Sequence, residues 1–237
     1  MSAVWHVPLM LLKSHLLSSC DVGIPIIFLH GFLGTSQDWI PVCNELKNNF
    51  CIGIDLPGHG DSPFITSFYE ELSSIAPKFH LVGYSMGGRL GLGFAHRYEK
   101  QIASLTLIGA HFGLQKKERP ARLKQDAKWA QMLLERPIDE FLIQWYDQPI
   151  FHTLNRDQMR MMRQKQNPIS LAKTLLYYSL GKQPLYTPRG HLLVGEWDQK
   201  FCELYAPYSP YILKQAGHAA HLQQPKQIAQ LIQRFIS

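Results

Sequence analysis

Short apolar runs alternate with helical patterns along most of the chain. Apolar runs bounded by glycine or polar residues are typical of buried strands in a parallel sheet. They lie at residues 24–29, 50–54, 79–82, 105–108, 191–194 and 211–213. Apolar residues at helical spacing predict helices at residues 36–48, 67–75, 90–98 and 228–236. The alternation predicts an α/β fold with a mostly parallel central sheet flanked by helices.

Residues 115–182 break this alternation, because they contain helical patterns and no strand pattern. Residues 119–135 show the clearest helical stripe, and Asn155 is placed to cap a further helix that starts near Gln158. We therefore expect three or four helices that form a cap subdomain, inserted into a core made of residues 1–114 and 183–237. Residues 1–19 are expected to form initial strands, because they lack the basic flank and the cleavage site of a signal peptide.

The basic excess of the chain lies in the cap. The net charge is +6, and residues 116–189 hold 14 Lys/Arg and 7 Asp/Glu, a balance of +7. This segment has no nucleic-acid-binding motif and no long basic run. We therefore predict a small anionic substrate and no nucleic-acid partner, with a solvated basic face as the alternative.

The rest of the composition indicates an ordinary globular protein. The chain has 237 residues, 46% of them hydrophobic and 18% charged, which is enough for a sizeable core. Its four cysteines lack C-x-x-C spacing and are expected to be reduced thiols in a cytoplasmic protein. No apolar run approaches the ~20 residues of a membrane span, so no membrane partner is expected. No cluster has the spacing of a metal site, so neither a metal nor another cofactor is predicted. We expect a monomer or a small homo-oligomer.

Ser85 lies at the centre of a G-x-S-x-G pattern that runs from Gly83 to Gly87. Between a strand and a helix, this pattern is typical of the nucleophile elbow, a strained turn that exposes the serine hydroxyl. The glycines are needed because the sharp turn leaves no room for larger side chains. The pattern also arises by chance, so its context decides.

Two further candidates follow later strands, Asp198 after residues 191–194 and His218 after residues 211–213. The order Ser, Asp, His is that of α/β-hydrolases. His218 is expected to accept the proton of Ser85, and Asp198 to hold the imidazole in the required tautomer. The alternatives are a turn residue for Asp198 and a buried polar group for His218. His59 is a weaker candidate for the base, because it lies in a Pro-Gly turn.

The backbone N–H groups of Phe32 and Met86 are candidates for an oxyanion hole. Phe32 belongs to a His-Gly loop after the first long apolar run, and Met86 directly follows Ser85. In elbow enzymes these two positions supply the donors that stabilise developing negative charge. The alternative is a plain glycine turn.

The chain resembles α/β-hydrolase-fold proteins over nearly its whole length. It is more specifically similar to the family of 2-succinyl-6-hydroxy-2,4-cyclohexadiene-1-carboxylate synthases, lyases of menaquinone biosynthesis. The segments that carry the resemblance include FLHGF at 28–32, DLPGHG at 55–60, LVGYSMGGR at 81–89, WYDQPIF at 145–151, GEWDQKF at 195–201 and AGHAAH at 216–221. In one departure, the stretch from Asp55 to Ser85 is about ten residues shorter than the family pattern, so its helix must be shortened or replaced by loop.

The resemblance implies a polycarboxylate substrate that loses pyruvate by elimination. Guanidinium groups match carboxylates bidentately, so Arg89, Arg122 and Arg163 are expected to bind them, with Arg119 as a further candidate. The resemblance also places Tyr84, Trp145 and Tyr146 in the substrate site. The alternative interpretation for each arginine is an exposed position on a helix. The alternative for Trp145 and Tyr146 is ordinary packing within the cap.

The implied mechanism is proton abstraction by Ser85, activated by His218 and Asp198, followed by expulsion of pyruvate. Two other functions stay open. A serine hydrolase, such as a carboxylesterase or a C–C bond hydrolase, would use the same triad through an acyl-enzyme. A non-catalytic ligand-binding protein on a hydrolase scaffold is the alternative of another class.

Overall fold

The central sheet of the computed structural model has seven strands in the order β1-β3-β2-β4-β5-β6-β7. The structure describes residues 10–18, 20 and 22–237. Among the described strands, β1 pairs with β3 in the antiparallel sense and the other neighbouring strands pair in parallel. The strands are β1 Ser14–Leu16, β2 Ile26–Leu29, β3 Cys51–Ile54, β4 Phe79–Tyr84, β5 Ile102–Ile108, β6 His191–Gly195 and β7 Tyr211–Leu213. The predicted fold class is confirmed. Within the stretch 1–19 that was expected to form initial strands, β1 is present at Ser14–Leu16, and residues 1–9 and 19 lie outside the described part.

Two hydrophobic cores cover the two faces of this sheet. In β2, Ile27 and Leu29 belong to one core, whereas Ile26 and Phe28 belong to the other. This alternation follows from the two-residue period of a strand. A strand that is buried on both faces is therefore apolar throughout, which is why its sequence is an unbroken apolar run.

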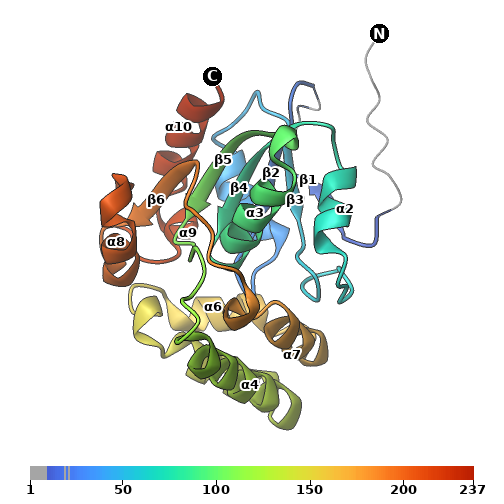
Figure 1. Ribbon diagram of the computed structural model, residues 1–237, viewed down its shortest axis with the longest axis vertical. Coiled ribbons are helices and arrows are strands. Elements are labelled where there is room, and N and C mark those ends of the chain that lie inside the picture. Colours follow the sequence, from blue (N-terminus) through green and yellow to red (C-terminus); the bar gives the residue numbers. More distant parts are fainter. Residues whose placement is uncertain (1–9, 19, 21) are drawn as a thin grey trace.

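The helices of the core lie on both sides of the sheet (Figure 1). One hydrophobic core takes residues from α2 Phe68–Ser74, α3 Met86–Arg97 and α8 Gln199–Tyr205. The other takes residues from α1 Ile40–Cys43, α9 Ala220–Gln223 and α10 Pro225–Ile236. Short 3-10 turns lie at η1 Ser36–Trp39, η2 Glu99–Gln101 and η5 Ala206–Tyr208. The shortened stretch before the elbow strand holds α2, a helix of seven residues.

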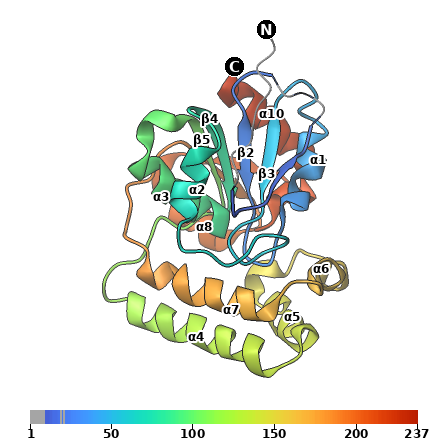
Figure 2. The ribbon, with the colours of Figure 1, turned by 90° about the vertical axis from the view of Figure 1, so that its right-hand side faces the viewer.

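The insertion between β5 and β6 forms a separate helical layer below the sheet (Figure 2). It contains α4 Arg119–Glu135, α5 Ile138–Tyr146, α6 Arg156–Arg163 and α7 Pro168–Tyr177, with the turns η3 Pro149–Phe151 and η4 Leu180–Lys182. As expected, the side chain of Asn155 caps α6 by accepting from the Gln158 amide. The cap has its own cluster of buried apolar residues. The subdomain boundaries at 114/115 and 182/183 stay a prediction.

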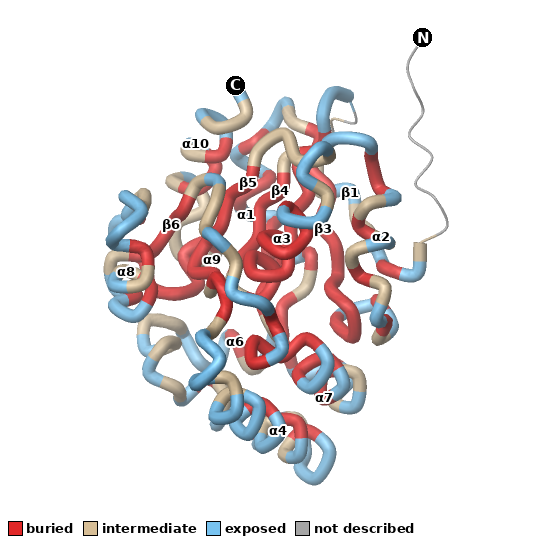
Figure 3. Tube along the Cα trace, viewed as in Figure 1, coloured by how far each residue is buried: buried red, intermediate tan, exposed pale blue. Residues whose placement is uncertain are grey.

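Burial is densest in the sheet and α3, whereas the outer sides of the cap helices are exposed (Figure 3). No helix in the described part of the chain is both long and apolar enough to cross a membrane. All four cysteines are free thiols. The cap helices lie as a layer over the carboxyl ends of the strands (Figure 2).

Candidate active site

Ser85 lies in a strained turn between β4 and α3. Its φ is 48° and its ψ is −109°, a backbone conformation that residues other than glycine rarely adopt. The turn is held by hydrogen bonds from the Ser85 amide to the Ile108 carbonyl, at 2.9 Å, and from the Gly87 amide to the His30 carbonyl, at 3.0 Å. A side chain at Gly87 would collide with the backbone of the chain after β2. The geometry matches the expected elbow.

The structure brings Ser85, His218 and Asp198 into one hydrogen-bonded chain. His218 Nε2 lies 3.1 Å from Ser85 Oγ, and His218 Nδ1 lies 2.7 Å from Asp198 Oδ2. Asp198 follows β6 and His218 follows β7, so both reach the same edge of the sheet as the elbow. Both side chains are buried. The imidazole stacks on Phe201 and contacts Tyr84, with ring centroids 5.0 and 5.2 Å away. These contacts hold the ring between the other two residues.

A cavity of about 570 Å³ opens over this chain, between the core and the cap. Ser85, Asp198 and His218 line it, together with the two oxyanion candidates, Phe32 and Met86. Met86 is the first residue of α3, so its N–H has no partner within the helix. The oxyanion role of Phe32 and Met86 stays a prediction, and the position of both at the cavity is compatible with it.

Arg89 and Arg122 both line this cavity, as expected from the sequence. Arg89 is only 8% exposed; its guanidinium donates to the Tyr178 carbonyl and to Gln183 Oε1. Burial, with a smaller effect of Arg122, lowers the pKa of Arg89 to about 10, so the group stays charged at neutral pH. Arg122 donates from Nε to Asp126 Oδ1 at 2.8 Å. Two cations therefore face the cavity from opposite sides of the core–cap boundary.

Arg163 and Arg119 have other partners. Arg163 forms a bidentate pair with Asp38, with N–O distances of 2.8 and 2.7 Å, and both side chains are buried. Burial opposes this charge, but Asp38 and the neighbouring Tyr146 outweigh that effect and raise the pKa of Arg163. Arg119 donates from Nε to the Leu114 carbonyl at 3.1 Å. The structure does not bring either arginine to the large cavity.

A smaller cavity of about 40 Å³ is also lined by Ser85. Tyr84, Tyr146 and Arg163 line this smaller cavity, and Trp145 lines both. The Tyr84 ring lies against both His218 and His221, and the Trp145 ring lies 4.9 Å from the Phe32 ring. The three aromatic residues named from the sequence therefore lie next to the Ser85–His218–Asp198 chain, and of the three Trp145 alone faces the large cavity.

The large cavity has three titratable residues that the sequence analysis did not identify, His111, His152 and Lys200; the pKa values of His111 and Lys200 are shifted. Burial, and to a lesser degree Arg122, lowers the pKa of Lys200. Burial lowers the pKa of His111 to about 4, so its imidazole is neutral at pH 7. Lys200 and His111 each lie a few positions past the end of a strand, β6 for Lys200 and β5 for His111. This position after a strand could have indicated a place in the site, because side chains that follow parallel strands lie together at one edge of the sheet.

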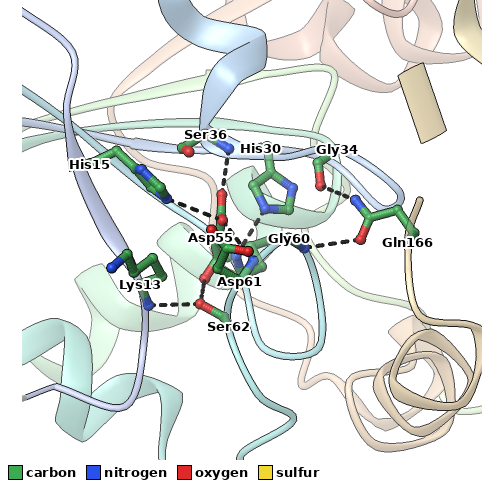
Figure 4. Close-up of polar contacts among 11 residues, drawn as sticks. Lys13, His15, His30, Gly34, Ser36, Asp55, Gly60, Asp61, Ser62 and Gln166 are labelled. Atoms are coloured by element: carbon green, nitrogen blue, oxygen red, sulfur yellow. Dashed lines mark hydrogen bonds and ion pairs between the residues drawn. The ribbon is translucent and has the colours of Figure 1, made fainter. Parts of the chain in front are cut away.

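Asp55 is the centre of a polar network between β1 and the turn at residues 57–62 (Figure 4). Its carboxylate accepts from the amides of Ser36 and Asp61. Burial opposes the charge of Asp55, but these bonds and the nearby His30 outweigh that effect and lower its pKa. His15, Asp55 and Asp61 offer ligand atoms within 4.8 Å of one another. Because the Asp55 oxygens already accept amide donors, we interpret this group as a structural network. His59, the alternative base, is fully buried in the same turn.

Comparison with known proteins agrees with this geometry. A family model for the alpha/beta hydrolase fold matches residues 24–187. A 2-succinyl-6-hydroxy-2,4-cyclohexadiene-1-carboxylate synthase from Enterobacter sp. is 32% identical, over 90% of this chain and 92% of the relative. A synthase of the same name from Yersinia enterocolitica is 33% identical, over 90% of this chain and 86% of its own.

Two solved structures share the fold. The structure of MenH from S. aureus has a TM-score of 0.86 and 25% sequence identity, and the match covers 95% of this chain and 97% of that one. A thermophilic esterase from Thermogutta terrifontis has a TM-score of 0.75 at 22% identity, covering 95% of this chain and 92% of its own. The second likeness concerns the fold alone. The chain belongs to the alpha/beta hydrolase fold family and, within it, to the family of 2-succinyl-6-hydroxy-2,4-cyclohexadiene-1-carboxylate synthases.

Proposed function

We propose that the protein is a carbon–oxygen lyase of menaquinone biosynthesis. The proposed reaction removes pyruvate from 2-succinyl-5-enolpyruvyl-6-hydroxy-3-cyclohexene-1-carboxylate and leaves 2-succinyl-6-hydroxy-2,4-cyclohexadiene-1-carboxylate. Family membership supports the reaction class. The observation that carries the proposal is the Ser85–His218–Asp198 chain at the base of a cavity that is lined by several cationic side chains.

The charge of the substrate fits these cations. The proposed substrate has three carboxylates, on the ring, on the succinyl chain and on the enolpyruvyl group. Arg89, Arg122 and Lys200 line the cavity, and guanidinium and ammonium groups bind carboxylates through charge-assisted hydrogen bonds. We assign these three residues to carboxylate binding. A neutral ester would offer these cations no carboxylate to bind, which favours the lyase over a general esterase.

The chemical step is an elimination across the ring. Ser85, whose hydroxyl proton passes to His218, abstracts the proton at C2 of the ring, next to the succinyl ketone. The C–H electrons form the C2=C3 bond, the former C3=C4 bond moves to C4=C5, and the C5–O bond breaks. The leaving enolpyruvate takes up a proton and becomes pyruvate. Asp198 stabilises the imidazolium that forms on His218.

Negative charge develops on the ketone oxygen when the C2 proton leaves. The amides of Phe32 and Met86 are assigned to this oxygen, since both residues line the cavity beside Ser85. Trp145 walls the site from the cap side. Tyr84 is assigned to holding the His218 ring, against which it packs, and Tyr146 to supporting Arg163. Arg163 itself is assigned to its pair with Asp38 rather than to the substrate.

The test supplies purified enzyme with the enolpyruvyl substrate and measures pyruvate, with p-nitrophenyl acetate hydrolysis measured in parallel. The lyase proposal predicts pyruvate release with a kcat/KM far above that for the ester. No pyruvate release, together with rapid ester hydrolysis, would establish the serine hydrolase instead. Tight binding of the substrate with no turnover would establish the binding protein. The cytoplasmic location expected from the sequence stays a prediction.

A further inference from the structure

The end of α6 contacts the loop that carries Phe32. Gln166 lies three residues after the helix and is only 8% exposed. Its Nε2 donates to the carbonyls of Leu33 and Gly34, both at 3.0 Å, and its Oε1 accepts from the Gly60 amide at 2.9 Å. Figure 4 shows this amide bridging the loop at Gly34 and the turn at Gly60. One cap side chain thus joins two loops of the core.

The loop needs this support because its backbone is strained. Leu33 has a φ of 68°, although it is not glycine, and its side chain is fully buried. A branched residue in the left-handed region persists only where the surroundings fix it. Gln166 binds the peptide carbonyl on each side of Gly34, directly after the strained residue. The strained residue is adjacent to Phe32, whose amide is the proposed oxyanion donor.

A second contact fixes the far end of the same loop. Arg163 holds Asp38 through two hydrogen bonds, and both side chains are almost fully buried. Arg163 and Gln166 are three residues apart, so one short segment of the cap forms hydrogen bonds with the loop at residues 33–34 and again at residue 38. The Leu33 side chain also belongs to the hydrophobic cluster of the cap.

We propose that Gln166, together with Arg163, is a positioning residue for the oxyanion hole. The cap segment 163–166 holds the loop 31–38 in the conformation that presents the Phe32 amide to the reacting oxygen. The catalytic part of this inference rests on the proposed function, because it takes Phe32 as an oxyanion donor. The structural part, the fixing of the loop by the cap, does not.

The experiment compares Gln166→Leu and Gln166→Glu with wild type and with the control Gln164→Leu. Gln164 is exposed and lies two residues away on the same segment, where its side-chain amide donates to the Met161 carbonyl of its own helix. Gln166→Glu retains an acceptor for the Gly60 amide but loses the donor to Leu33 and Gly34. Hydrogen–deuterium exchange of residues 31–38 is measured for each folded protein, together with kcat and KM for pyruvate release.

Both Gln166 variants are expected to exchange residues 31–38 at least tenfold faster than wild type, while β4 and α3 stay protected. We expect kcat to fall about 10- to 100-fold with KM nearly unchanged, because an oxyanion contact is made chiefly in the transition state. Gln164→Leu is expected to match wild type in both measurements.

Unchanged exchange in both Gln166 variants would overturn the proposal. So would faster exchange without a loss of kcat, or a rise in KM alone, which would assign Gln166 to substrate binding. If wild type releases no pyruvate, the proposed function fails, while the exchange measurement still decides whether the cap fixes the loop.

Discussion

Arg89 and Arg122 differ in how much freedom the fold leaves their guanidinium groups. Arg89 is buried and bonded to the Tyr178 carbonyl and to Gln183, so it is pre-positioned. Arg122 has a side chain that is 33% exposed and a single partner in Asp126.

Replacing Arg122 by alanine tests the carboxylate assignment. We expect the KM for pyruvate release to rise at least tenfold, because one charge-assisted contact is worth roughly 1.5–3 kcal/mol. The kcat is expected to change much less, since the contact exists in both ground and transition states. The matched control is Arg156→Ala, which removes an exposed cap arginine that pairs with Asp147. Equal KM values for Arg122→Ala and wild type would refute the assignment.

Residue-scale features divide into those that the sequence predicts and those that it does not. The elbow, Asp198 and His218 could be predicted as candidates because each lies just after an apolar run, and the structure brings all three together at one sheet edge. The substrate role expected for Arg163 is not supported by its surroundings, because its guanidinium is paired with Asp38. The sequence could not reveal this pair, since the two residues lie 125 positions apart and no local pattern links them. Lys200 was missed because its cavity-facing position depends on how the cap folds over the core.

At the scale of elements, α6 connects the cap to the core through its last turn. It contributes Arg163 to the buried pair with Asp38 in η1. The expected helix at residues 36–48 is instead η1 followed by the four-residue α1. Ser36 does not cap this segment; its amide donates to Asp55 and ties the helix start to the neighbouring turn. Tertiary contacts therefore set the local structure here, which helical spacing alone does not predict.

Replacing Arg163 by alanine is expected to destabilise the fold strongly. The free energy of unfolding should fall by about 3–5 kcal/mol, because Asp38 would be left buried and unpaired. Urea denaturation monitored by circular dichroism measures this change. A variant with wild-type stability and a greatly raised KM would contradict the structural assignment and restore Arg163 as a substrate ligand.

At the scale of the whole molecule, the fold buries several neutral histidines between its layers. Burial lowers the pKa of both His59 and His221 to about 3, from 6.5 in an unfolded chain. His221 lies between Trp39 and Tyr84, and His59 lies against His30 and Phe32. The folded protein therefore binds fewer protons than the unfolded chain between pH 6.5 and about pH 3.

This difference predicts acid sensitivity. The contribution of these two histidines to the free energy of unfolding is fully present above pH 6.5 and is lost as the pH falls towards 3. The free energy of unfolding falls by about 1.4 kcal/mol per pH unit for each histidine in this range. His221→Phe removes one of these groups and should reduce the slope by about that amount between pH 6 and 4. Unfolding free energies from urea titrations at several pH values give the slope. An unchanged slope would show that His221 is not a buried neutral base.

The core and its cap also divide the work of the whole molecule. The core supplies the proposed triad and both proposed oxyanion donors. The cap supplies Arg122, Trp145 and the segment 163–166, which is hydrogen-bonded to the loop at residues 31–38. The alternation of apolar runs and helical patterns predicts the sheet and its helices, because a buried strand is recognisable as a short apolar run in the local sequence. How the cap sits on the core depends on contacts between distant segments, and these required the structure.

The most direct test of the account is pyruvate release from the enolpyruvyl substrate by wild type and by Ser85→Ala, side by side. Pyruvate and the conjugated diene, which absorbs in the near ultraviolet, are followed in the same sample. We predict that wild type forms the two products in equal amounts, and that Ser85→Ala lowers kcat by roughly 10³-fold or more while the protein stays folded. Equal rates for the two proteins, or no pyruvate from wild type, would contradict the assignment of Ser85 as the base of an elimination.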